Sequence, residues 1–149
     1  MLRNLLKNVR RPVINFVSYR KPRKPNIYVL APEGLCQFTP HMISPEFDLP
    51  VTELIAHFEE IFFSMPNTEF LTERLTGENG QDIQKEYVHY SRLIGFPDTI
   101  TVRFMSLAEG RSSIALISRS HYGYRDLGVN KGRVYYLMQK LAEKLGIKE

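Results

Sequence analysis

Four runs of residues between positions 68 and 121, joined by short turns, constrain the fold of this chain most strongly. In the run that contains Ile100, Val102 and Phe104, apolar side chains alternate with polar ones. Alternation with a period of two is typical of β-strands, and turns as short as residues 108–111 join antiparallel neighbours. The pattern therefore predicts an antiparallel sheet of about four strands. The predicted strands cover residues 68–75, 87–94, 99–107 and 113–121.

Two amphipathic helices are expected on either side of these strands in the sequence. The first covers residues 51–65, after Pro50 and before Pro66,. The last helix has Asn130 as its expected N-cap and Gly146 at its C′ position. Its buried stripe is predicted to contain Val134, Leu137, Met138, Leu141 and Leu145,. Together these elements predict an α+β two-layer sandwich with both helices on one face of the sheet, and residues 27–30 are expected to form a short edge strand.

The charge of the chain is unevenly distributed along its 149 residues. The formal net charge is +4, but eight of the 20 basic residues and no acidic residue precede Glu33, which leaves 12 basic against 16 acidic residues. We therefore expect a basic tail and linker over residues 1–25 and a single, mildly acidic domain over residues 26–149. A nucleic-acid-binding domain carries basic residues on its own face, so no nucleic-acid partner is expected.

The tail repeats apolar residues at helical spacing, with arginines and lysines between them,. A basic amphipathic helix of this kind can lie on an anionic membrane surface through residues 1–20, with Pro12 kinking or ending it. Three alternatives stay open: a helix packed on its own domain, a frayed tail and, in a eukaryote, a transit peptide that directs the protein to an organelle. If no transit peptide directs the protein to an organelle, we expect it in the cytoplasm, either free or attached to a membrane surface.

The residues that commonly bind metals or form disulfides are few. Cys36 is the single cysteine, so no disulfide within the chain is possible, and the four histidines show no zinc-ligand spacing,. We therefore expect neither a metal nor a cofactor. No run approaches the roughly 20 apolar residues of a membrane-spanning helix.

Residues 118–133, read SRSHYGYRDLGVNKGR, concentrate polar groups between the last strand and the last helix. Arg119 and His121 are expected on one side of the strand, because residues two apart share a face, and Ser118 and Ser120 on the other. Arginines that converge on a helix N-terminus can hold a phosphate, sulfate or carboxylate. The candidate ligand-binding residues are Arg119, His121, Arg125, Asp126, Asn130 and Arg133.

The same residues also have a purely structural interpretation. Asp126 would then pair with an arginine, Asn130 would cap the helix, and the glycines would adopt positive φ angles. No catalytic residue is predicted. A Ser120–His121–Asp126 triad is not expected, because adjacent strand residues face opposite ways, and no motif supports Cys36 as a nucleophile.

The sequence of this junction resembles the end of the domain of unknown function 1499 family. The family pattern is close to R-S-x-S-R-x-G-x-x-D-x-G-V-N-R-x-R, and the residues that match it are Ser118, Arg119, Gly123, Asp126, Gly128, Val129, Asn130 and Arg133. Lys131 stands where the family usually has arginine. Upstream, GFPDTITVRF resembles a second family segment through Phe96 and Asp98. The resemblance covers about residues 25–146.

A third segment, PNIYVLAPEGLC, resembles a family element with two cysteines, but Ala31 occupies the first cysteine position and Cys36 the second. This departure argues against a two-cysteine disulfide or metal site. The family occurs in bacteria and in plastid-bearing eukaryotes, and the resemblance implies no particular reaction.

These observations favour a non-catalytic binding or accessory domain that uses its arginine-rich junction to hold a small anionic ligand or a protein partner. One alternative is an enzyme of unrecognised type that acts on a small anionic substrate, with Arg119, His121 and Asp126 in its site. The other is a scaffold module attached to a membrane surface through residues 1–20.

Overall fold

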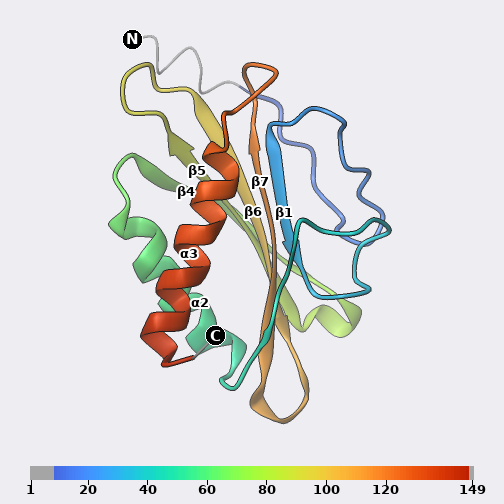
Figure 1. The fold of residues 1–149 in the computed structure, drawn as a ribbon. Helices are drawn as coiled ribbons and strands as arrows, with labels where there is room; N and C mark the ends of the chain where they lie inside the picture. The colour runs from blue at the N-terminus through green and yellow to red at the C-terminus, as the bar shows by residue number, and fades with distance from the viewer. Residues whose placement is uncertain (1–8, 148–149) are drawn as a thin grey trace.

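The computed structural model describes residues 9–147 of the chain. This part contains seven strands and two α-helices (Figure 1). The strands are β1 (Ile27–Ala31), β2 (Met42–Ile43), β3 (Glu46–Phe47), β4 (Thr68–Thr76), β5 (Asp82–Tyr90), β6 (Pro97–Ser106) and β7 (Ser112–Ser120). The helices are α2 (Val51–Ser64) and α3 (Val129–Leu145).

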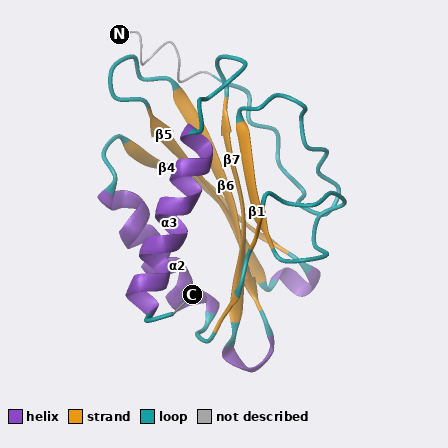
Figure 2. Cartoon of the chain, in the orientation of Figure 1, coloured by secondary structure: helices purple, strands orange, loops and turns teal. Residues whose placement is uncertain are grey.

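All strands belong to one sheet, in the order β2-β1-β7-β6-β5-β4, and β3 also pairs with β7. Among the strand pairs of residues 9–147, only that of β1 and β2 is parallel, so the sheet is mixed but mostly antiparallel. Helices α2 and α3 cover one face of it (Figure 2), which we call the helix face. The predicted α+β fold with two helices on one face is confirmed.

The predicted number of about four strands is wrong. Strand β1 is not at the edge, because Leu30 pairs with Leu116 of β7 on one side and with Met42 of β2 on the other. Strands β2 and β3 have two residues each and lie in the proline-rich stretch 32–50, where no alternation marks them. Strand β5 begins at Asp82 instead of residue 87, because its polar first half pairs with β4 and β6.

Aromatic and aliphatic side chains fill the space between the helices and the sheet. Phe58 and Phe62 of α2 pack against Tyr87 of β5, and Phe58 also against Phe104 of β6. Helix α3 buries Val134, Leu137 and Leu141 in the same core, with Met138 and Leu145 partly buried beside them. The predicted stripe of α3 is therefore confirmed. So is the predicted end of the helix, where Gly146 adopts a φ of 69°.

The opposite face of the sheet, which we call the second face, is covered by the N-terminal segment and by part of the stretch 32–41. Ile14 and Phe16 are buried there against residues of β1, β6 and β7, while Val13 and Val17 are exposed. Residues 9–25 contain no helix, and residues 16–18 form a turn in which the N–H groups of Val17 and Ser18 donate to the side chain of Asn15. The helix predicted for the tail is therefore wrong over residues 9–17. Residues 1–8, which begin that prediction, lie outside the described residues.

Between residues 9 and 147, no helix is long and apolar enough to cross a membrane.

Candidate functional site

The end of β7 sends its side chains alternately to the two faces of the sheet, as the sequence predicts. Ser118 and Ser120 lie on the helix face, where both contact Asn130. Arg119 and His121 lie on the second face, beside Thr99 of β6. The sheet therefore separates the candidate residues into different groups, and it keeps Ser120 away from His121.

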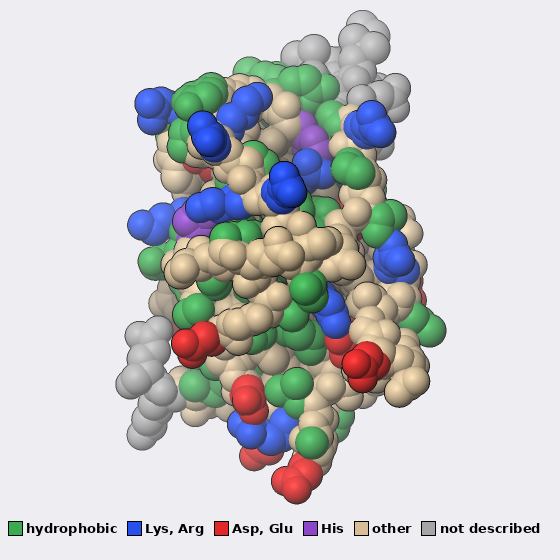
Figure 3. All heavy atoms as spheres, turned by 90° about the vertical axis from the view of Figure 1, so that its right-hand side faces the viewer, with side chains coloured by type: hydrophobic (Ala, Val, Ile, Leu, Met, Phe, Trp, Pro, Cys, Tyr) green, Lys and Arg blue, Asp and Glu red, His purple; other side chains and the backbone are tan. Residues whose placement is uncertain are grey.

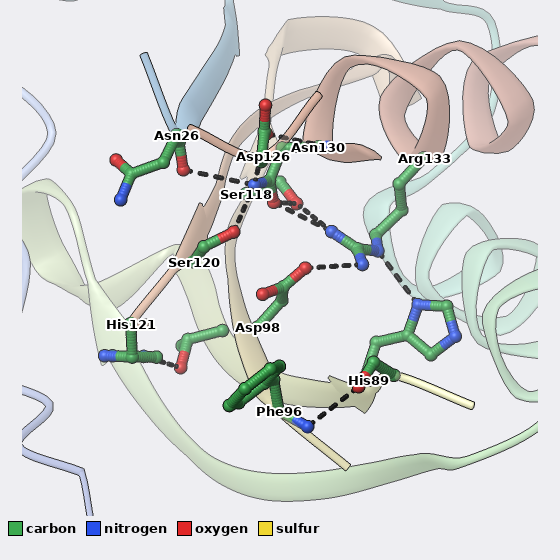
Figure 4. Close-up of polar contacts among 12 residues, drawn as sticks. Asn26, His89, Phe96, Asp98, Ser118, Ser120, His121, Asp126, Asn130 and Arg133 are labelled. Carbon is green, nitrogen blue, oxygen red and sulfur yellow. Dashed lines mark hydrogen bonds and ion pairs between the residues drawn. The ribbon is translucent and has the colours of Figure 1, made fainter. Parts of the chain in front are cut away.

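Arg133 is the centre of a buried network on the helix face (Figure 4). Its Nε donates to Nδ1 of His89 at 2.9 Å, and its Nη1 donates to Oγ of Ser118 and Oδ1 of Asn130 at 2.9 and 2.8 Å. Its Nη2 lies 2.8 Å from Oδ2 of Asp98 and forms an ion pair with it. Arg133 is only 7% exposed. Its guanidinium is therefore engaged by partners within the protein.

Asp126 and Asn130 hold the start of α3. The Asp126 carboxylate accepts hydrogen bonds from the backbone N–H groups of Gly128 and Asn130, at 2.9 and 3.1 Å. The Asn130 amide donates to Asp126, to Ser120 and to the backbone carbonyl of Asn26. Burial acts to raise the pKa of Asp126, but the hydrogen bonds from Asn130 and Gly128 outweigh it and lower that pKa.

Two details of the expected cap are therefore wrong. Asn130 is not the N-cap, because α3 begins at Val129 and Gly128, with a φ of 82°, occupies the N-cap position. The side chain of Asp126, four residues before Asn130, supplies the capping acceptor,. Arg133 pairs with Asp98 of β6 and not with Asp126. Sequence reasoning noted Asp98 in a family segment but had no signal that it meets the junction.

Burial and the charge of Arg133 shift the pKa values of its two titratable partners, His89 and Asp98. Burial, followed by the charge of Arg133, lowers the pKa of His89 to about 4. The imidazole is therefore neutral at physiological pH, which fits the role of its Nδ1 as acceptor from Arg133,. Burial raises the pKa of Asp98, and the Arg133 guanidinium acts in the opposite direction.

The second face carries a group of basic side chains made of Arg11, Arg119 and His121, which we call the basic cluster. Thr99 connects two of them: its Oγ1 accepts from Nε of Arg11 at 2.8 Å and lies 2.5 Å from Nε2 of His121. Burial, then the charges of Arg119 and Arg11, lower the pKa of His121 to about 4. Burial lowers the pKa of Arg11, the charge of the nearby Glu86 acts in the opposite direction, and the charge of Arg119 lowers the pKa further.

Arg119 differs from Arg133 in having no acceptors for part of its guanidinium. Its Nε and Nη2 atoms are buried and have no hydrogen-bond partner in the part of the chain that the structure describes. Buried polar groups without a partner are rare in native proteins and call for an explanation, such as a bound water or ion. The basic cluster is thus the part of the junction that keeps hydrogen-bond donors without an acceptor among the described residues.

Arg11 was not among the candidate residues. Its place follows from the path of residues 9–19 across the sheet, and no motif in the tail marks it. Arg125, which was a candidate, lies apart from both groups on the exposed loop after β7, with its guanidinium carbon 5.7 Å from the centre of the Tyr124 ring. No group of three or more His, Cys, Asp or Glu residues within 9–147 could hold a metal ion.

The fold and the junction define a class: an α+β domain whose last strand and last helix are fixed together by a buried Asp–Arg–Asn network. The chain belongs to the family described as "Protein of unknown function (DUF1499)", whose model matches residues 21–141. The resemblance seen in the junction sequence is thereby confirmed. No curated protein is significantly similar to the chain in sequence.

Proposed function

We propose that this protein is a non-catalytic binding domain that holds a small oxyanion, such as phosphate, sulfate or a carboxylate, at the basic cluster. The observation that carries the proposal is the Arg119 guanidinium, whose buried Nε and Nη2 atoms have no acceptor among residues 9–147. A planar oxyanion edge offers two acceptors to one guanidinium, and such bidentate pairs are among the strongest hydrogen bonds in proteins.

The charge of the basic cluster supports the same conclusion. Arg119 and Arg11 repel one another, since the charge of Arg119 lowers the pKa of Arg11. It also lowers the pKa of His121. A bound anion would relieve this repulsion and would favour protonation of His121, which would then become a further donor.

Arg133, Asn130 and Asp126 support the site without contacting the anion. Their hydrogen-bonding groups are engaged with each other and with Asp98, Ser118 and the backbone. Their role in this proposal is to fix the end of β7, and with it the position of Arg119.

Binding is favoured over catalysis by the burial of the hydroxyl group in the cluster. Thr99 and His121 place a hydroxyl beside an imidazole, which are the groups that act as nucleophile and general base in many enzymes,. Thr99 is 0% exposed, however, and its hydroxyl is already engaged by both Arg11 and His121. The contact therefore serves to orient His121.

The proposal is tested by thermal unfolding with sodium sulfate, against sodium chloride of equal ionic strength. Arg119→Met removes the unpartnered guanidinium, and Arg74→Met, on exposed β4, removes an equal charge outside the cluster. Sulfate should raise the Tm of the wild type and of Arg74→Met by linkage, and leave that of Arg119→Met unchanged. Without sulfate, Arg119→Met should be as stable as the wild type or more so. The proposal fails if sulfate has no specific effect on the wild type, or stabilises Arg119→Met equally.

A further inference from the structure

Two loops at one end of the molecule expose large apolar side chains that the core does not bury. They are residues 91–96, between β5 and β6, and residues 121–128, between β7 and α3, and we call them together the loop end. Both loops lie at the top of Figure 1, at the opposite end from the turn that joins β6 and β7. The rings of Phe96 and Tyr122 connect them, with centroids 5.5 Å apart.

The loop end exposes apolar side chains at its tips. Leu93 is 97% exposed and Leu127 is 94% exposed, so neither stabilises the fold by burial. Four further large hydrophobic residues are exposed in the same loops: Ile94, Phe96, Tyr122 and Tyr124. Single exposed apolar residues are common, but a group of them at one end of a protein marks an interaction surface.

The backbone at Leu127 strengthens this conclusion. Leu127 has a φ of 53°, in the left-handed region that disfavours residues with a side chain,. The conformation is fixed by Asp126, whose carboxylate accepts from the N–H group of Gly128 on the other side of Leu127. Leu127 therefore adds backbone strain without adding buried apolar area to the fold. Strained residues of this kind cluster at sites that contact a ligand or another surface.

Basic side chains surround the apolar tips. Arg92 and Arg125 lie in the two loops and Lys131 in the first turn of α3, and all three are exposed. Asp126 is the single acidic residue of the loop end, and its carboxylate is engaged at the start of α3. Figure 3 shows a related charge distribution on the neighbouring face, where most basic side chains lie in the upper half and most acidic ones in the lower half.

We propose that the loop end docks on an anionic lipid bilayer, with Leu93 and Leu127 inserted among the lipids. Arg92, Arg125 and Lys131 would then lie at the level of the phosphates, and the aromatic rings at the interface, where such rings are enriched in membrane proteins. Apolar side chains on two protruding tips suit insertion into a bilayer. This inference is independent of the oxyanion site, because the side chains that carry it (Leu93, Leu127, Arg92, Arg125 and Lys131) do not belong to the basic cluster.

The first test is co-sedimentation of the full chain with phosphatidylcholine vesicles that contain or lack phosphatidylserine. The double variant Leu93→Asp with Leu127→Asp changes both tips. Leu75→Asp is the matched control, because Leu75 is 68% exposed on β4, outside the loop end. The wild type and the control should bind the anionic vesicles, and the double variant should bind at least about tenfold more weakly. Arg125→Gln should weaken binding about fivefold.

A second measurement reports insertion directly and does not depend on the aspartate variants folding. The chain contains no tryptophan, so Leu127→Trp introduces a single fluorescent reporter. Its emission should shift to shorter wavelength on anionic vesicles, while that of Leu75→Trp should not.

Three results would overturn the inference: no binding of the wild type to anionic vesicles, equal binding by the double variant, or no spectral shift at Leu127→Trp. Equal binding by the double variant would assign the contact to residues 1–20 instead. Arg119→Met should bind vesicles as the wild type does, so failure of the oxyanion site and failure of the loop end are distinguishable.

Discussion

Replacing Arg133 with methionine should destabilise the fold more than any other single change in the junction. The substitution keeps a long apolar side chain at the start of α3 but removes the guanidinium. It deletes the ion pair with Asp98 and the hydrogen bonds to His89, Ser118 and Asn130. These partners belong to β5, β7, α3 and β6, so the change acts on most of the elements that meet at this end.

The expected loss of stability follows from the carboxylate of Asp98, which would lose its ion-pair partner. Asp98 is buried, and Arg133 is its ion-pair partner at 2.8 Å. Removing one partner of a buried ion pair costs about 3–5 kcal/mol, because the other charge loses its compensation. The total stability of a domain is about 5–15 kcal/mol, so Arg133→Met should stay folded but unfold at a much lower urea concentration.

Urea denaturation at pH 7 measures this cost, and a double-mutant cycle isolates its source. Asp98→Asn alone leaves Arg133 without its counter-charge, whereas Arg133→Met with Asp98→Asn removes both charges. The coupling energy should reach about 2–3 kcal/mol, with the double variant less damaged than the sum of the single variants. A loss below about 1 kcal/mol for Arg133→Met, or additive effects in the cycle, would refute the argument that the pair is buried and mutually required.

Two further predictions concern the core and the histidines. Leu141 is 0% exposed in the core beneath α3, so Leu141→Ala should reduce the free energy of unfolding by about 2–5 kcal/mol; a loss under about 0.5 kcal/mol in urea would contradict its assignment,. His89 and His121 each have a pKa lowered from 6.5 to about 4, so between these values the unfolded chain binds more protons than the folded one. The stability that the two neutral imidazoles contribute is therefore present above pH 6.5 and is lost as the pH falls toward 4. Each imidazole should lower the free energy of unfolding by on the order of 3 kcal/mol at most over this range. The urea midpoint measured against pH should show this decline, and His89→Gln should make it shallower; an equal decline in the variant would contradict the role of His89.

Local periodicity explains what the sequence could predict. The two helices, the buried stripe around Leu141 and the opposite orientation of Ser118 and Arg119 all depend on residues within a few positions of each other,. The same approach failed in the tail, where the apolar spacing fits a helix. Ile14 and Phe16 are buried instead as alternate residues of a segment without a helix, because the sheet offers them an apolar surface.

The residues of the candidate site come from distant parts of the chain and meet only in the folded protein. Arg133 and Asp98 are 35 positions apart, and Arg11 and Thr99 are 88 apart. No spacing within a motif encodes such pairs. The junction sequence could therefore show that its polar groups have hydrogen bonds to make, but not that Arg133 makes them within the fold while part of Arg119 does not.

The packing of Ile14 and Phe16 limits how far the chain can be truncated from its N-terminus. The matched family region begins at residue 21, yet both side chains lie before it, in contact with the apolar residues of the second face. A chain shortened to the family boundary would leave Val29, Met105 and Ile117 uncovered, and exposed apolar surface of this kind favours aggregation,. It would also lose Arg11. We therefore expect a chain that begins at residue 21 to be less stable than one that keeps residues 9–20.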